Sequence, residues 1–202
     1  MINVAEIRYK ADITAGALKL PASRLIADLL LRQVDAAGWK NAIAKQNLLQ
    51  ARSPATARRL TQLLRGRLET MGPDLWTLVR DGTGTVATQA VFAAAVKHSP
   101  LLGDFLAIVV REQYRLFATA LSNNLWAVYL GGCRERDPAM PHWNESTRDR
   151  LRSSVFQMLA QVGYLESTRS LKLQAVHLAK QVLGYLQANH EAYVLRCLQV
   201  AP

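Results

Sequence analysis

The sequence predicts an all-α protein. Prolines recur at the starts of amphipathic segments, β-branched residues are sparse, and few stretches alternate between polar and apolar side chains with the period of a strand. Proline is tolerated in the first turn of a helix but not further inside one, so each of these prolines marks a helix start. With 202 residues, 50% of them apolar, the chain can bury a core as one large domain or as two small ones.

These signals predict helices over nine segments: 22–35, 38–47, 54–71, 73–81, 84–98, 100–120, 123–135, 144–162 and 176–196. Leu20-Pro21, Ser53-Pro54, Gly72-Pro73 and Ser99-Pro100 open four of them. Ser53 and Ser99 are placed as N-caps, because a serine hydroxyl there can accept a hydrogen bond from an otherwise unpaired backbone N–H. Gly163 follows the 144–162 helix and is expected to end it.

The most flexible internal stretch is Gly82-Thr83-Gly84-Thr85, and it predicts the domain boundary. We expect an N-terminal helical domain over 1–82 and a C-terminal helical domain over 83–202. Residues 169–174 alternate between polar and apolar side chains, a pattern compatible with a short β wing. The C-terminal domain would then end in a winged-helix-like unit.

Charge is distributed unevenly along the chain. The net charge is +10, and the 33 residues between Asp35 and Glu69 contain no acidic residue. The same stretch contains seven cations: Lys40, Lys45, Arg52, Arg58, Arg59, Arg65 and Arg67. A local field of this strength favours a polyanionic partner, and nucleic acid is the commonest one.

This basic stretch predicts a helix-turn-helix-like pair over 38–71, in which the second helix presents arginine and glutamine outward as a recognition helix does. At the helical period, Ala57, Leu64 and Leu68 fall on one face of 54–71, while Arg58 and Gln62 fall on the opposite face. The predicted nucleic-acid contacts are Lys40, Lys45, Arg52, Ser53, Thr56, Arg58, Arg59, Gln62 and Arg65.

Two alternatives accompany this prediction. The basic face could be merely solvated, although an inert surface normally mixes charges of both signs. Arg67 does not fit the contact surface, because it projects near the apolar face, and it could pair with an acid elsewhere in the fold.

The 144–162 helix followed by Arg169 and Lys172 is a second candidate contact, for which packing in the core is the simpler explanation.

No catalytic, metal or cofactor site is predicted. The four histidines are dispersed, with no pair at i, i+4 and no cysteine close enough to suggest zinc. The glycines at 82 and 84, or at 131 and 132, do not build a phosphate-binding loop. Asp104 and Glu112 lie on an otherwise apolar helix and are expected to form ion pairs with neighbouring arginines. We therefore expect a protein that is not an enzyme.

Compartment and membrane association follow from composition. Two cysteines, Cys133 and Cys197, do not suggest a disulfide framework, and residues 1–6 lack the features of a secretory signal. The apolar stretches 86–96 and 101–110 are shorter than the roughly 20 residues that cross a bilayer. A cytoplasmic protein without membrane insertion is expected.

Three segments of the sequence form a recognisable set. They are Ile13-Thr14-Ala15-Gly16-Ala17-Leu18 running into Pro21-Ala22-Ser23-Arg24; Asn47-Leu48-Leu49-Gln50-Ala51-Arg52-Ser53-Pro54-Ala55-Thr56-Ala57-Arg58-Arg59; and Ala87-Thr88-Gln89 through Lys97-His98-Ser99 to Leu102-Gly103-Asp104-Phe105. In order and spacing they resemble the BrxA family, a component of bacteriophage exclusion (BREX) defence islands. The similarity covers about residues 10 to 120 well and the remainder loosely. None of the three segments is a catalytic motif.

The resemblance implies an all-helical, NusB-like bundle that acts in a multi-gene antiphage system with an adenine-specific DNA methyltransferase. It also implies DNA binding, in agreement with the basic stretch. Older labels called the family inner-membrane proteins, which the short apolar stretches argue against. The expected function is a non-enzymatic accessory protein that binds double-stranded DNA, with other defence-system proteins as further partners. The alternatives are an RNA-binding NusB-like module and a basic scaffold for an acidic protein.

Overall fold

The computed structural model describes residues 8–13 and 17–200, and these are predominantly helical, as the sequence predicts. Residues 1–6, where a secretory signal was sought, lie outside the described part, as does Thr14-Ala15-Gly16 of the segments that resemble the BrxA family. Within the described residues, pairing of extended chain is limited to two isolated antiparallel bridges. The all-α fold class is confirmed.

The chain divides into two compact units that are discontinuous in sequence. Unit 1 contains residues 1–17, 99–177 and 193–202, and unit 2 contains residues 18–98 and 178–192. This division differs from the expected boundary at residue 82, which falls inside unit 2. The helices on either side of Gly82 pack on each other, so the glycine-rich stretch is a tight connection within one unit.

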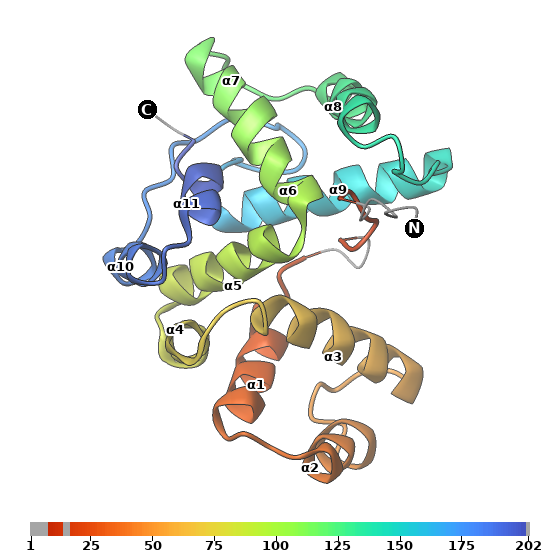
Figure 1. Cartoon of the computed structure of the whole chain (residues 1–202), viewed down its shortest axis with the longest axis vertical. Helices are drawn as coiled ribbons and strands as arrows, with labels where there is room; N and C mark the ends of the chain where they lie inside the picture. Colours follow the sequence, from red (N-terminus) through yellow and green to blue (C-terminus); the bar gives the residue numbers. More distant parts are fainter. Residues whose placement is uncertain (1–7, 14–16, 201–202) are drawn as a thin grey trace, which may run out of the picture. The chain divides into compact units, whose positions relative to one another are not determined.

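Five longer helices make up unit 2: α1 (Leu20–Leu31), α3 (Pro54–Leu68), α4 (Pro73–Asp81), α5 (Gly84–His98) and α10 (Lys180–Ala188). α4 packs against α1, α5 and α10, and α3 packs against α1 and α5. α5 is the central helix, and its side chains from Val86 to Val96 are buried apart from Thr88 (Figure 1). Because neighbours surround α5, its sequence is apolar on nearly every face.

A short helix leads to the loop before α3. α2 (Ala36–Lys40) begins at Asp35, whose side chain accepts a 2.7 Å hydrogen bond from the backbone N–H of Gly38. The chain continues without a break into a π-helical turn, η1 (Asn41–Lys45). Trp39, Ala42 and Ile43 are buried, which anchors this segment to the rest of unit 2.

Unit 1 contains α6 (Pro100–Asp104), a π-helical segment η2 (Phe105–Val110), α7 (Arg111–Arg115), α8 (Asn123–Arg136), α9 (Glu145–Val162) and most of α11 (Ala192–Leu198). α6, η2 and α7 follow one another as a continuous rod (Figure 1). Phe105 packs edge-on against Trp126 at 5.3 Å and Tyr129 at 5.2 Å between ring centroids. These aromatic contacts hold α8 against the rod.

The ends of α9 match the sequence prediction. The Asn144 side chain accepts a 2.8 Å hydrogen bond from the backbone N–H of Thr147 and caps the first turn. Gly163 adopts a left-handed φ of 98° at the end of the helix. Glycine is favoured there because it has no Cβ to clash in this conformation.

Two predicted helices are shorter or broken. The helix expected over 100–120 ends at Arg115, and Phe117 follows with a left-handed φ of 53°. The helix expected over 176–196 is two helices, α10 and α11, separated at residues 189–191, where His190 has a φ of 56°. Asn189 donates its side-chain amide to the Tyr185 carbonyl and occupies an acceptor at the end of α10.

Over 169–174, where a short β wing was a possibility, the described chain reverses direction and pairs through isolated bridges, and no strand is formed. Lys172 and Leu173 form isolated bridges with Ala120 and Leu165, and Leu171 is buried. The alternating pattern therefore marks a short extended segment packed into unit 1. No single helix among residues 8–13 and 17–200 combines the length and the hydropathy needed to cross a bilayer, although the bent succession of Gly84–His98 and Pro100–Arg115 meets both criteria when the two are taken together.

Candidate nucleic-acid interface

The start of α3 is built as the sequence predicts. The Ser53 hydroxyl accepts a hydrogen bond from the Thr56 backbone N–H at 3.2 Å and lies 3.0 Å from the Thr56 hydroxyl. Pro54 occupies the first turn, where its missing N–H leaves no bond unmade. Ser53 and Thr56 are thereby engaged with each other at the helix start, and the Thr56 side chain is exposed.

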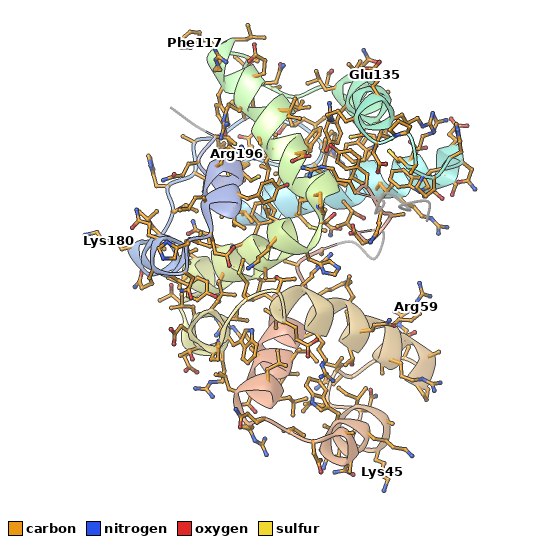
Figure 2. The ribbon with its side chains drawn as sticks, in the orientation of Figure 1. Lys45, Arg59, Phe117, Glu135, Lys180 and Arg196 are labelled. Carbon is orange, nitrogen blue, oxygen red and sulfur yellow. The ribbon has the colours of Figure 1, made fainter. Side chains whose placement is uncertain are left out.

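α3 is amphipathic in the predicted orientation. Ala57, Leu64 and Leu68 are buried against the rest of unit 2. Arg58, Arg59 and Gln62 are exposed on the other side. Figure 2 shows Arg59 extending away from α3.

The connection to α3 corrects the expected helix-turn-helix. The chain leaves η1 at Lys45 and enters α3 at Pro54, so residues 46–53 form a loop longer than the three- or four-residue turn of that motif. The Asn47 side chain bonds both the N–H and the carbonyl of Ala51 at 3.0 Å. Asn47 and Gln50 have left-handed φ values of 46° and 50°. Residues 38–71 are therefore a helix–loop–helix with a folded loop.

Five cations in this region are exposed and make no ion pair with a carboxylate among the residues that the structure describes. They are Lys40, Lys45, Arg52, Arg58 and Arg59, which are the exposed cations of one segment and which we call the basic surface; Figure 2 shows Arg59 and Lys45 extending in different directions from α3 and η1. Lys45 projects from the end of η1 (Figure 2). Without carboxylates to neutralise them, these side chains keep their attraction for an anionic partner.

Five of the six acidic residues of unit 2 are engaged in ion pairs or in a helix cap. Asp28 and Asp81 pair with Arg80, and Glu69 pairs with Arg65. Glu191 pairs with Lys97, and Asp35 caps α2. Unit 2 carries 13 Lys and Arg against 6 Asp and Glu, so most of the chain's excess positive charge lies in this unit.

Two arginines of the predicted stretch differ from the five. The Arg65 side chain is 43% exposed, its Nε donates to Glu69 Oε1 at 2.6 Å, and its guanidinium lies 4.7 Å from the centre of the Trp39 ring. Arg65 therefore contributes to packing between α3 and α2. Arg67 is 1% exposed and points into the unit, as its place near the apolar face predicts.

A groove of about 510 Å³ adjoins the basic surface, between the start of α1, the loop 46–53 and the start of α3. Leu25, Leu48 and Leu60 line its apolar floor, and Arg52 and Thr56 also face it. Lys19 lines the groove too, although it lies far from the basic stretch in sequence. Predicting the helices does not identify Lys19 as a residue of the groove. Lys19 reaches the groove because α1 packs beside α3.

The described residues contain no group of three or more His, Cys, Asp or Glu side chains that could hold a metal ion. Cys133 and Cys197 are buried free thiols of unit 1. Burial raises the pKa of Cys197 to about 11, which keeps this thiol protonated at neutral pH. The exposed side chains of the basic surface itself offer positive charge and hydrogen-bond donors.

Comparison with known proteins agrees with this architecture. Residues 7–190 match the BrxA family. The chain belongs to the BrxA family. Its sequence is 53% identical to the BREX protein BrxA of Paramagnetospirillum magneticum over 98% of this chain and the whole of that protein. It is 35% identical to the BREX protein BrxA of Escherichia coli O9:H4 (strain HS) over 87% of this chain and 83% of that protein.

A solved structure has the same fold. The crystal structure of an uncharacterized protein from Magnetospirillum magneticum superposes with a TM-score of 0.91 at 51% sequence identity. The match covers 96% of this chain and all of that chain. The all-α BrxA fold thus extends over nearly the whole sequence.

Proposed function

We propose that this BrxA family member is a non-enzymatic accessory protein of a BREX bacteriophage-defence system, and that it binds double-stranded DNA in the cytoplasm through the basic surface of unit 2. The observation that carries the proposal is that five cations of one segment are exposed and unneutralised by any described carboxylate. The names of the two BrxA relatives support the defence role.

The residue types of the basic surface suit the DNA backbone. Arginine clamps phosphate with a planar fork of donors, and lysine supplies a point charge. Such contacts position a protein on the duplex but read little sequence. Gln62 lies exposed on the same helix as Arg58 and Arg59, and we propose it as the contact to a base edge.

The test is a fluorescence-anisotropy titration of a labelled DNA duplex over a series of salt concentrations. Each phosphate neutralised by the protein contributes about −0.9 to the slope of log K against log salt. Replacing Arg58 and Arg59 with alanine should therefore make the slope shallower by about 2. Charge reversal, Arg58→Glu with Arg59→Glu, should weaken binding by roughly 100-fold in low salt.

A charge-matched control is available in the same unit. Arg32 and Lys180 are exposed outside the basic surface, and Figure 2 shows Lys180 at the start of α10. Arg32 pairs with Asp28 at 3.5 Å in an exposed i,i+4 contact that contributes little to stability. The double variant Arg32→Glu with Lys180→Glu changes net charge by the same amount as the test variant. If both variants weaken binding equally, the attraction belongs to the net charge of the protein and the proposed surface is wrong.

Two competitors discriminate the alternatives. Structured RNA that displaces the duplex at equal concentration would favour an RNA-binding module. An acidic protein retained after nuclease treatment, and lost with Arg58→Glu and Arg59→Glu, would favour a scaffold that uses the same surface. DNA remains the proposed partner if the duplex outcompetes both.

A further inference from the structure

A second group of cations lies in unit 1, around a cavity of about 510 Å³. Four arginines from four parts of the sequence line it: Arg8, Arg111, Arg136 and Arg196. The other lining residues are Tyr9, Asp104, Ala107 and Ile108. None of these residues belongs to the basic surface, so the cavity is a separate feature of the molecule.

Asp104 is the only carboxylate among the residues that line this cavity, and its oxygens are occupied. Oδ2 accepts hydrogen bonds from Arg8 Nη2 at 2.7 Å and from the Tyr9 hydroxyl at 2.9 Å, while Oδ1 accepts from the Tyr193 hydroxyl at 2.9 Å. The hydrogen bond from Arg8 to Asp104 raises the pKa of Arg8 and fixes this guanidinium as a permanent cation. Asp104 thus neutralises one of the four arginines.

The other three arginines are held by neutral groups. Arg136 Nε donates to the Tyr9 hydroxyl at 3.0 Å. Arg111 donates to the backbone carbonyl of Arg196 at the end of α11. The Arg196 guanidinium lies 5.6 Å from the centre of the Tyr193 ring and forms no ion pair with a carboxylate of residues 8–13 or 17–200. Within residues 8–13 and 17–200, no carboxylate forms an ion pair with Arg111, Arg136 or Arg196.

The cavity also has an apolar side. Ala107 and Ile108 lie on η2, and Ile108 is 45% exposed. Small-molecule sites combine an apolar wall with a few fixed polar groups, and a volume of about 300–1,000 Å³ is typical of them. The cavity is open to solvent, and four parts of the sequence present guanidinium donors to it.

We propose that the four-arginine cavity of unit 1 binds the terminal phosphate groups of a nucleotide. Guanidinium forks match phosphate oxygens bidentately, and charge-assisted bonds of this kind are about twice as strong as neutral ones. A ligand with a single carboxylate would neutralise only one of the three remaining positive charges. A diphosphate or triphosphate carries enough negative charge to neutralise all three. The wall formed by Ala107 and Ile108 faces the sugar or base of the nucleotide.

The terminal phosphate could belong to a free nucleotide or to the 5′ end of a DNA strand, because the recognising chemistry is the same. Isothermal titration calorimetry with the full chain separates phosphate recognition from recognition of the base. The probes are adenosine triphosphate, inorganic pyrophosphate and adenosine. Triphosphate and pyrophosphate should both bind, and adenosine should not. Equal binding of adenosine, or no binding of either phosphate probe, would overturn the proposal.

The decisive variant is Arg196→Glu, because Arg196 is exposed and donates no side-chain hydrogen bond to a described residue. Triphosphate affinity should fall at least about tenfold, the loss of a charge-assisted contact. The matched control Arg169→Glu makes the same charge change at an exposed turn of unit 1 outside the cavity, and it should alter affinity less than about twofold.

A second variant protects the test against misfolding. Ile108→Glu places a carboxylate at the cavity at a position that is already 45% exposed, so the core is left intact. It should weaken triphosphate binding as Arg196→Glu does, and circular dichroism should show both variants folded. Triphosphate affinity within twofold of the unmodified protein in whichever variant is folded would overturn the assignment.

The two sources of phosphate are separated in the Arg58→Glu, Arg59→Glu background, where binding through the basic surface is weakened. If a 5′-phosphorylated duplex displaces triphosphate and a 5′-hydroxyl duplex does not, the cavity binds the phosphorylated end of a DNA strand. Failure of both duplexes to displace it identifies a free nucleotide. Loss of triphosphate binding in this background alone would place the site in unit 2 and overturn the proposal.

Discussion

The cations of the two units are arranged in different ways. In unit 2, Arg58 and Arg59 project from an open helix surface and are exposed to solvent. In unit 1, Arg8 and Arg136 line a cavity. Arg8 donates to the Asp104 carboxylate, and Arg136 donates to the Tyr9 hydroxyl. The excess of basic over acidic residues is seven in unit 2 and three in unit 1. Separate exposed cations, as in unit 2, suit an extended polyanion such as DNA. Several donors directed at one space, as in unit 1, suit a compact anion.

The comparison also shows why charge alone is a poor guide to a site. Arg65 belongs by sequence to the basic stretch, yet it stacks over Trp39 and pairs with Glu69. Arg196 is isolated in sequence from other arginines of its cavity, yet the fold brings it to three of them. The neighbours of each guanidinium decide whether it stabilises the fold or is available for a ligand.

The largest expected effect is a crossed pattern of binding losses. Arg58→Glu with Arg59→Glu should weaken duplex DNA binding roughly 100-fold and leave triphosphate binding within about twofold. Arg196→Glu should weaken triphosphate binding and leave binding of a duplex with 5′-hydroxyl ends nearly unchanged. Anisotropy and calorimetry on the same preparations measure both. If either variant weakens both ligands equally, the two groups of cations do not act separately.

The next effect is on the stability of unit 1. Asp104→Ala removes the acceptor shared by Arg8, Tyr9 and Tyr193, and should lower the free energy of unfolding by about 2–3 kcal/mol. Urea denaturation followed by circular dichroism measures the change. Glu135→Ala is the control, because Glu135 is exposed on α8 and pairs with no described cation. An equal change in both variants would mean that Asp104 does not organise the cavity.

A smaller effect should separate Arg65 from its neighbours in α3. Arg65→Ala loses the contact with Trp39 and the pair with Glu69, and should cost about 1 kcal/mol of stability with little change in DNA affinity. Arg58→Ala should weaken DNA binding and leave stability nearly unchanged. Thermal melting and anisotropy on the two variants decide between them. A loss of DNA affinity as large for Arg65→Ala as for Arg58→Ala would show that Arg65 contacts DNA as well.

The smallest effect concerns alkaline pH. Burial raises the pKa of Cys197 from an ordinary 9.0 to about 11, and it also raises the pKa of Tyr9 and of Tyr193. The unfolded chain therefore releases these protons at lower pH than the folded protein, so stability is full below about pH 9 and falls as the pH rises toward 11. Cys197→Ala should show a shallower fall in melting temperature over that range, and an unchanged slope would assign the effect to other groups.

Local structure was largely predictable because its causes are local. Pro73 and Gly84 mark helix starts that the structure reproduces, and Ser53 and Gly163 act as the expected cap and stop. Ser99 was a partial error: it precedes α6 as predicted, but its hydroxyl donates to Asp12 and makes no cap bond. The Ser99 hydroxyl is engaged with the carboxylate of Asp12, 87 residues away, and not with a backbone N–H of α6.

Errors arose where distant segments decide the outcome. The amphipathic pattern of 176–196 continues through the break at residues 189–191, and the alternation at 169–174 does not reveal that Leu171 is buried. Asp104 was expected to pair with an arginine, and it does, but its partner Arg8 lies 96 residues away. Periodicity reports which face of a segment is buried and not which segment covers it.

The sequence by itself determined the helical fold class, the outward face of α3 and the concentration of positive charge between Asp35 and Glu69, because helix period, proline placement and charge are properties of neighbouring residues. Tertiary structure decided the division into two interleaved units, the burial of Arg67 and the meeting of four arginines in one cavity. Those outcomes depend on contacts between residues far apart in the chain, which a pattern along the chain does not specify.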